Sequence, residues 1–450
     1  CGTTLTLGES GDTVTLGTGA SQSGFGRTGT VDWDTTPKTA TFSAVSGDGF
    51  FANTEGGAFT MNLPAGVAGA IVSVADYAAT WQTNNLTVSP NGTDKIGGVN
   101  VDLILDTEGQ SVTFVYVDST QGWINTMDST SNERAATFIT ATGGTITTCG
   151  NDKIHTFTGP GTFAVSQIST TAAENIVSYV VVAGGGGGGT RYGGAGGGGG
   201  FREVKSPLTP YTASPLDGYP NSPNRVTLTA ASFPITVGGG GAGSPTQASG
   251  GNSSQGTSGV NSVFSTVTSA GGGGGGSEAA PGPRHGVAGG SGGGGSYSAG
   301  VSCAGCGGAG NTPSVSPAQG FAGGNGGPAS GYGAGGGGGA TAVGTNGAAP
   351  NTTGVGGAGA TSSINGTPTA RAGGGGGGGN QDGIPTGGAG GAGGGGAGGP
   401  SPNGLSTVGT VNTGGGGGGG RGNPDTSPQT QPNGGATGGS GIVIIRYKYQ

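Results

Sequence analysis

Charge, histidine and long apolar runs are all scarce in this 450-residue chain. Charged residues make up 8% of it and the formal net charge is -7. Nucleic acid binding requires clustered positive charge, so that class of function is excluded. We also expect no membrane-spanning helix, because no run of about 18 apolar residues occurs. With only two histidines, His155 and His285, a Ser-His-Asp site is not expected.

Cysteine is also rare, and its spacing excludes most cysteine chemistry. The chain has four cysteines, Cys1, Cys149, Cys303 and Cys306, too few and too scattered for a disulfide-stapled scaffold. The Cys303-x-x-Cys306 motif lacks the following helix of a thioredoxin-like site and the second ligand pair of a zinc site. We therefore expect either a short local disulfide or two free thiols in a tight turn.

No motif predicts an enzyme. The phosphate-binding pattern G-x-x-x-x-G-K-[ST] is absent, and G-x-G-x-x-G has no meaning in so glycine-rich a chain. The carboxylates Asp102, Asp106, Asp118 and Asp128 have no basic partner nearby in the sequence, which indicates solvated side chains. His155 is expected to be a pairing or capping histidine in a strand. We predict a non-enzymatic protein with no cofactor and no metal.

Glycine, by contrast, is abundant and unevenly placed. Of the 118 glycines, 94 follow Ala183, about one residue in three, the level of collagen-like chains. The strict G-X-Y period is missing, which argues against a collagen triple helix. The longest runs are Gly184–Gly189, Gly271–Gly276, Gly373–Gly379 and Gly414–Gly420.

The region before the glycine runs has the alternation of β-strands. In "TLTLGESGDTVTLG", Leu5, Leu7, Val14 and Leu16 occupy alternate positions on either side of a turn, which predicts a hairpin. Similar short segments continue to about Asp128, separated by turn signals such as Asn91-Gly92. This pattern favours an all-β sandwich, jelly roll or trimeric β module.

Within this region, several pieces occur in an order found in a known group of proteins. They are Asp76-Tyr77, "NNLTV" at 84–88, Asn91-Gly92 and "VYVDSTQGW" at 115–123. Over residues 47–123 the chain resembles a β module that recurs in the tail fibres of bacteriophages. The resemblance implies a trimeric virion protein and carries over no catalytic residues.

The composition divides the chain into four expected parts. A β stalk or hairpin segment covers residues 1–46, and the β fibre module covers 47–130. A small β unit over 131–175 has Phe138, Ile154 and Phe163 among its expected core residues. The glycine-rich part covers 176–450.

The glycine runs can fold if they form helices of polyproline II geometry that lie side by side. Such a helix has no internal hydrogen bonds, so each N–H can reach a neighbour's carbonyl. A run of six or seven residues would span roughly 19 to 22 Å. The apolar segments 176–183 and 441–449 are expected to lie close together and to close the bundle. The repeated runs favour packing within one chain, and disorder is the alternative for low-complexity segments.

The order of strands and glycine runs resembles the glycine-rich domain that ends many phage fibres. The resemblance rests on "KIHTFTGPGTFAV", "YVVVAGGGGGG", "ITVGGGGAG" and "GGSGIVIIRY" and covers residues 153–449. Loops between the runs carry side chains suited to recognition, since Tyr and Arg give large contact areas with few rotors. The alternative is that the tyrosines cap the bundle and the arginines solubilise it. The candidate receptor-binding residues are Tyr192, Tyr211, Tyr219, Arg284, His285, Tyr297 and Tyr332.

The resemblance implies a homotrimeric phage tail fibre or adhesin in the virion, and the residues themselves predict a rigid, extended, non-catalytic scaffold with recognition loops. Its expected partners are other virion tail proteins and a bacterial surface polysaccharide or outer-membrane protein. One rival is a structural subunit of a capsid fibre or extracellular filament. A polysaccharide-degrading tailspike is the other rival, but it needs paired carboxylates, and acidic residues are scarce from Gly184 onward.

Overall fold

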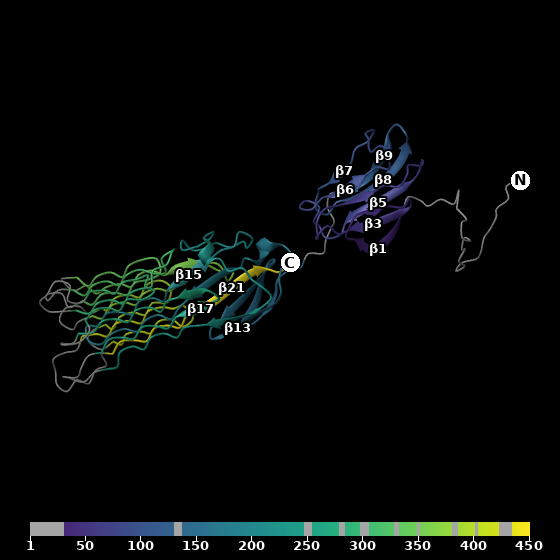
Figure 1. Cartoon of the computed structure of the whole chain (residues 1–450). Coiled ribbons are helices and arrows are strands. Elements are labelled where there is room, and N and C mark those ends of the chain that lie inside the picture. The colour runs from purple at the N-terminus through teal and green to yellow at the C-terminus, as the bar shows by residue number, and fades with distance from the viewer. Residues whose placement is uncertain are drawn as a thin grey trace, which may run out of the picture. The chain divides into compact units, whose positions relative to one another are not determined.

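The chain forms two compact units, Cys1–Ala135 and Ala136–Gln450. A computed structural model describes residues 31–129, 137–246, 254–278, 284–297, 306–327, 333–348, 352–379, 386–400, 404–422 and 434–450. Both units are built from β-strands, which confirms the all-β prediction (Figure 1). The hairpin predicted over Leu5–Leu16 lies outside the described residues.

The first unit is a sandwich of two sheets. One sheet has the order β1-β3-β5-β8-β9 and the other β2-β4-β6-β7. Residues of the expected stalk, 1–46, contribute β1 and β2 to these sheets. The strands are β1 (Asp32–Lys38), β2 (Phe42–Ser43), β3 (Asp48–Ala52), β4 (Phe59–Asn62), β5 (Ile71–Asp76), β6 (Leu86–Ser89), β7 (Leu103–Leu105), β8 (Ser111–Asp118) and β9 (Gly122–Ser129).

The first strands of both sheets run parallel. The chain crosses to the opposite sheet after each of its first five strands. As a result, β1, β3 and β5 are parallel neighbours in one sheet, and β2, β4 and β6 are parallel neighbours in the other. The last two strands of the larger sheet instead form a hairpin. The inward side chains of both sheets share one core, which includes Met61, Trp81, Phe114 and Trp123, all fully buried.

The second unit begins with a second sandwich. Its sheets have the orders β10-β13-β16-β17-β18 and β11-β12-β21-β14-β15, with a separate hairpin β19-β20. The expected small unit over 131–175 supplies β10 to β13 to these same sheets. The elements are β10 (Thr140–Thr142), β11 (Thr145–Cys149), β12 (Asp152–Phe157), β13 (Gly161–Gln167), the 3-10 helix η1 (Ala172–Asn175), β14 (Ser178–Val182), β15 (Phe201–Val204), η2 (Ser222–Asn224), β16 (Ser232–Thr236), β17 (Ser262–Phe264), β18 (Val267–Ser269), β19 (Ala360–Ser362), β20 (Thr369–Arg371) and β21 (Ile442–Lys448).

The sheet that contains β14 and β21 is covered on both faces. Tyr179 and Val181 of β14 face the core between the two sheets, whereas Val180 and Val182 face a second apolar cluster. A strand buried on both sides needs an uninterrupted apolar sequence, which explains "SYVVV" and "IVIIRY". β14 and β21 pair antiparallel, from Ser178 opposite Arg446 to Val182 opposite Ile442. This confirms the prediction that the two segments lie together.

A buried ion pair crosses this sheet from β21 to β12. The side chains of Arg446 and Asp152 are each 2% exposed, and Arg446 Nη2 lies 2.8 Å from Asp152 Oδ2. The guanidinium also donates to the backbone carbonyls of Ile364 and Pro210, at 3.2 and 3.4 Å. These bonds join the sheet to the β19-β20 turn and to the segment after β15.

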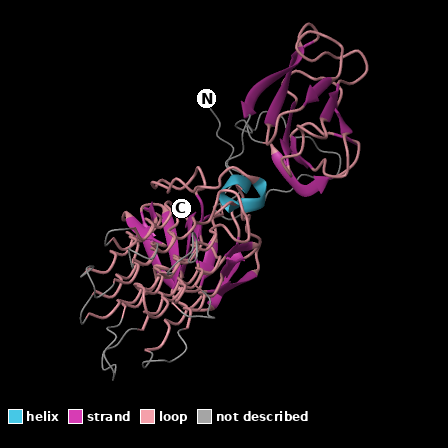
Figure 2. Ribbon diagram, turned by 90° about the vertical axis from the view of Figure 1, so that its left-hand side faces the viewer, coloured by secondary structure: helices cyan, strands magenta, loops and turns pink. Residues whose placement is uncertain are grey.

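Beyond the sandwich, the glycine runs form a bundle of extended segments (Figure 2). The run Gly184–Gly189 shows the pattern, because its N–H groups donate in turn to three neighbouring segments and each partner recurs at every third residue. The donor and acceptor pairs are Gly184 to Val260, Gly185 to Gly439, Gly186 to Gly197, Gly187 to Thr257, Gly188 to Ala436 and Gly189 to Gly194. This is the period of a three-residue turn, as the packed polyglycine II interpretation predicts.

The carbonyl groups of the same run accept from three further segments. The donors are Gly272, Gly241, Gly417, Gly275, Ser244 and Gly420, again with a period of three. The run is therefore surrounded by six segments of its own chain, and its backbone groups are paired without water. The segments approach so closely that a Cβ on Gly186 would lie 2.1 Å from the carbonyl oxygen of Gly273.

His155 lies in the core of the second sandwich. It is fully buried, and its ring stacks at 5.5 Å on Tyr447. Its Nδ1 lies 2.7 Å from the carbonyl oxygen of Gly143, so Nδ1 carries the proton and donates. Nε2 then accepts from the Tyr447 hydroxyl, at 3.0 Å. The neutral ring satisfies both contacts, which agrees with a structural role in the strand.

This environment predicts that acid destabilises the second unit through His155. Burial lowers the pKa of His155 below its usual 6.5, with the Lys153 charge as a lesser cause. Below about pH 6.5 the unfolded chain therefore binds the proton more readily, and stability falls as the pH decreases. We expect His155→Asn to reduce this slope by up to about 1.4 kcal/mol per pH unit. Chemical unfolding at pH 5 to 7.5 measures how the free energy of unfolding depends on pH. Equal pH dependence in the original chain and in His155→Asn would contradict the prediction.

Candidate recognition surface at the end of the glycine bundle

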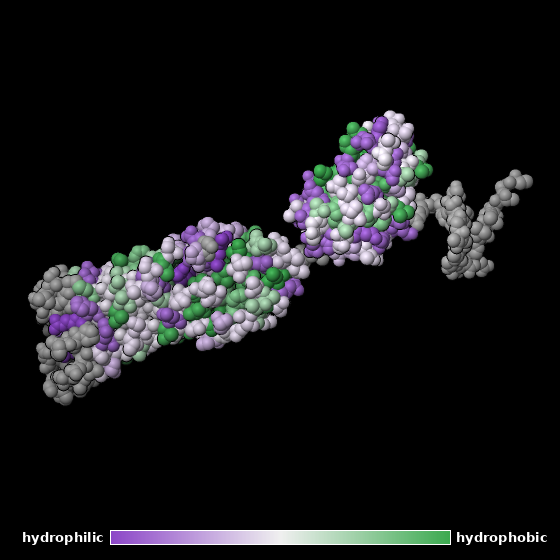
Figure 3. Space-filling view, viewed as in Figure 1, coloured by the Kyte–Doolittle hydropathy of each residue, from purple (hydrophilic) through white to green (hydrophobic). Residues whose placement is uncertain are grey.

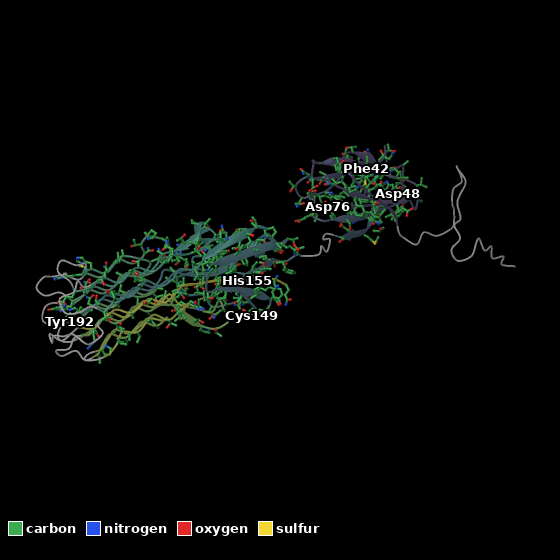
Figure 4. All side chains as sticks on the ribbon, turned by 90° about the horizontal axis from the view of Figure 1, so that it is seen from below. Phe42, Asp48, Asp76, Cys149, His155 and Tyr192 are labelled. Carbon is green, nitrogen blue, oxygen red and sulfur yellow. The ribbon has the colours of Figure 1, made fainter. Side chains whose placement is uncertain are left out.

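One end of the glycine bundle carries several of the residues that the sequence indicated. β14 leads into Gly184–Gly189, the chain turns at 190–192, and Gly193–Gly200 leads back to β15. Tyr192 therefore lies at the end remote from the sheets, as Figure 4 shows relative to His155. We name this end the tip and define it by Arg191, Tyr192, Glu278, Arg284, His285 and Tyr297.

The turn at the tip holds two side chains in an uncommon backbone conformation. Arg191 and Tyr192 have φ of 47° and 45°, the left-handed region that non-glycine residues seldom adopt. Thr190 anchors the turn, because its hydroxyl donates to the Ser254 carbonyl at 2.9 Å and lies 3.0 Å from the Ser244 hydroxyl. The turn is therefore tied to two neighbouring segments of the bundle.

Tyr192 lies between another tyrosine and bare backbone. Its ring centroid is 5.5 Å from that of Tyr297, with the planes tilted by 57°. On another side it packs on Gly422, where a Cβ would lie 2.1 Å from Tyr192 Cε1. Tyr297 is 4% exposed, whereas Tyr192 is only partly buried. Tyr297 therefore supports the ring of Tyr192, which faces solvent in part.

Charged and titratable groups belong to the segments that meet at this tyrosine pair. Arg191 Nε lies 3.5 Å from Glu278 Oε2, and both side chains are about a quarter exposed, at 25% and 28%. His285 is exposed, and its Nδ1 accepts the backbone N–H of Cys306 at 3.1 Å. The Arg284 carbonyl accepts the backbone N–H of Ser296, next to Tyr297, at 3.0 Å. An aromatic ring, a guanidinium and an imidazole in this arrangement suit non-covalent recognition by stacking and hydrogen bonding.

Two other expected tyrosines lie with the strands instead. Tyr211 packs against the second apolar cluster, and its ring centroid is 5.4 Å from the guanidinium carbon of Arg446. Burial raises the pKa of Tyr211 well above its usual range, as expected for a hydroxyl enclosed by protein. Tyr219 packs against the core between the sheets. Tyr211 and Tyr219 therefore do not join the tip residues.

The remaining expected residues are described only in part. Cys306 is disulfide-bonded, whereas Cys303 lies outside the described residues. Tyr332 is also outside the described part of the chain. Across the described ranges, no group of three or more His, Cys, Asp or Glu side chains could hold a metal ion. No helix in those ranges is long and apolar enough to cross a membrane.

Sequence reasoning missed a hollow in the second unit. Its volume is about 600 Å³. Its walls come from β15, η2, the β17–β18 region and a loop near residue 315, so no local motif could reveal it. The lining residues are Arg202, Asn221, Pro223, Asn224, Thr266, Val267, Thr268, Val315 and Ser316.

The second unit corresponds closely to a known family. Residues 156–448, more than half of the chain, match the family described as glycine-rich domain. The chain belongs to this family. In this glycine-rich domain, the matched residues begin within β12 and end at the last residue of β21, so the family pattern includes both the strands and the bundle. No curated protein matches the chain.

Proposed function

We propose that the chain is a non-enzymatic phage tail-fibre adhesin that attaches the virion to a bacterial surface through the tip. The observation that carries the proposal is a bundle of hydrogen-bonded glycine segments that holds Tyr192 at its end. The sequence resemblance to phage fibre modules supports the virion assignment. A receptor polysaccharide or outer-membrane protein would contact Tyr192, Arg191 and His285.

The construction of the bundle suits attachment. Six neighbouring segments fix the run that leads to the turn at 190–192, so the tip loses little conformational freedom on binding. Trimerisation would present three tips, and linked weak contacts give avid attachment. Assembly into a homotrimer and contacts with other tail proteins are parts of the same proposal.

The proposal predicts that Tyr192→Ala weakens binding to host cells. Removal of a central aromatic side chain from an interface commonly costs about 1 to 3 kcal/mol, so we expect about a tenfold or greater loss. The measurement is binding of the fluorescently labelled full chain to a panel of candidate bacteria. Val411→Ala is the matched control, because Val411 is 67% exposed and belongs to the turn beside Ala372, near the strands. Equal loss in both variants, or no loss in Tyr192→Ala, would contradict the assignment of the tip.

A structural filament subunit is a second candidate, and one observation favours it. Leu405, Val408 and Val411 are 62%, 63% and 67% exposed and follow one another at every third residue. With three residues per turn, Leu405 and Val408 lie about 9 Å apart on one side of an extended segment, and Val411 follows them at the turn that begins there. Figure 3 shows separate apolar groups among pale and hydrophilic ones on the surface of this unit. Sedimentation at rising concentration distinguishes the candidates, since a filament subunit polymerises and an adhesin trimer reaches a fixed mass.

A further inference from the structure

The hollow lined by Arg202 differs from the tip in position and chemistry. Arg202 lies on β15, at the strand end of the bundle. Thr266, Thr268 and Ser316 are exposed around the hollow, so it is open to solvent. Its volume of about 600 Å³ is within the usual range of small-ligand sites.

Arg202 brings a positive charge to this hollow. Arg202 takes part in none of the salt bridges among the described residues, so their carboxylates all lie farther than 4 Å from its guanidinium. Nη2 donates to Asn224 Oδ1 at 2.6 Å, while Nε and Nη1 donate to none of the described residues. Burial lowers the pKa of Arg202, so the protein around it partly desolvates the cation. An anion in the hollow would compensate for that loss.

Asn224 holds the guanidinium in place. It is 5% exposed, and its Nδ2 donates to the Ser316 carbonyl at 3.0 Å. Its own backbone carbonyl accepts the Tyr179 hydroxyl at 2.5 Å. These contacts connect the loop near 315, η2 and β14 through one residue. The guanidinium group of Arg202 is therefore oriented before any ligand arrives, which reduces the entropic cost of binding.

The other walls combine hydroxyl groups with small apolar surfaces. Thr266, Thr268 and Ser316 offer hydroxyls, and Asn221 offers an amide. Val267, Val315 and Pro223 offer apolar contact. A sugar presents hydroxyls at its rim and C–H groups on its faces, which is the complement of such walls. A guanidinium binds carboxylate or phosphate with two parallel hydrogen bonds.

We propose that this hollow binds an acidic sugar, with Arg202 on its anionic group and the surrounding hydroxyls on the ring. This second site goes beyond recognition at the tip and does not depend on it. The anionic group can be the carboxylate of a uronic acid or the phosphate of a sugar phosphate, since both fit a guanidinium. Neutral sugars should bind more weakly, because they leave Arg202 without a counter-charge.

Titration calorimetry of the full chain with glucuronate, glucose 6-phosphate and glucose tests the proposal. We expect at least one acidic sugar to bind about tenfold or more tightly than glucose, and its affinity to fall as salt is added. Preference for glucuronate assigns a carboxylate ligand, and preference for glucose 6-phosphate assigns a phosphate ligand. Equal affinity of all three sugars, or no binding of either acidic sugar, would overturn the proposal.

Variants place the binding at this hollow. Arg202→Gln should weaken acidic sugar binding by about tenfold or more, whereas Arg225→Gln, at an exposed arginine outside the lining, should leave it unchanged. Thr268→Trp serves as a second variant in case Arg202→Gln does not fold, since it fills the hollow from an exposed position and keeps Arg202. Unchanged affinity in a folded Arg202→Gln or Thr268→Trp protein would place the sugar elsewhere and overturn the assignment.

Discussion

Gly186→Ala is expected to destabilise the glycine-rich domain strongly, although it adds only one methyl group. The new Cβ would lie 2.1 Å from the carbonyl oxygen of Gly273, so the two segments must separate. Gly186 also donates to Gly197 and accepts from Gly417, and a shift weakens these bonds. Overpacking and weakened hydrogen bonds together should lower the free energy of unfolding by about 3 kcal/mol or more. Denaturant unfolding, followed by the signal of the second unit, gives the value.

Gly239→Ala is the matched control for this substitution. Gly239 belongs to the same bundle, but no atom lies within 4 Å of the position that its Cβ would take. We expect a change within about 1 kcal/mol, because the methyl group meets no neighbour and alanine restricts the unfolded chain. If Gly186→Ala and Gly239→Ala have equal stability, close packing of the runs is not what excludes side chains from position 186.

Asp152→Asn is expected to have the second largest effect. It leaves the guanidinium of Arg446 buried at 2% exposure without its charge partner. Loss of one member of a buried ion pair typically costs about 3 to 5 kcal/mol. Because asparagine can still accept one hydrogen bond, we expect a cost of about 3 kcal/mol, at the lower end of that range. Thermal or chemical unfolding of the full chain measures it.

Lys448→Gln provides the comparison for the ion pair. Lys448 Nζ lies 2.7 Å from Glu174 Oε1, but the lysine side chain is 33% exposed. Water screens such a pair, and its loss should cost at most about 1 kcal/mol. A cost for Asp152→Asn no larger than that for Lys448→Gln would show that burial does not strengthen the pair on β12 and β21.

Much of the fold follows from local sequence features. The alternation of apolar residues predicts the strands, and the flanks of the glycine runs predict that 176–183 and 441–449 lie close together. The length of the runs and the need to pair every N–H predict a bundle of polyproline II geometry. Each of these features is a pattern of residues adjacent in the sequence, although the contacts that it predicts join distant segments.

The glycine period is present in the sequence but hidden by its changing phase. On outer segments, glycine faces inward at every third residue, as at Gly256 and Gly259 or at Gly344 and Gly347. Between these positions the residues can carry side chains toward solvent, such as Thr257 and Asn346. Each turn has its own length and resets the phase, so a search for one continuous G-X-Y repeat finds nothing.

The candidate sites depend on long-range arrangement, and sequence reasoning predicted them only in part. Tyr192 and Tyr297 meet at the tip because two separate runs end there, whereas Tyr211 lies among the strands. The hollow around Arg202 draws its walls from four segments, and an arginine in a strand gives no local sign of it. Such sites become visible only when the topology is known.

The position of β21 between β12 and β14 has a consequence for how the protein is made. β14 emerges from the ribosome long before its neighbour β21, because the whole set of glycine runs separates them. During that interval the edge of β14 that later pairs with β21 is unpaired, and exposed strand edges promote aggregation. The runs themselves contain almost no apolar side chains, so these parts of the nascent chain stay hydrated rather than collapsing. Synthesis of β21 then supplies the missing strand, and the sheet closes only after translation has passed it.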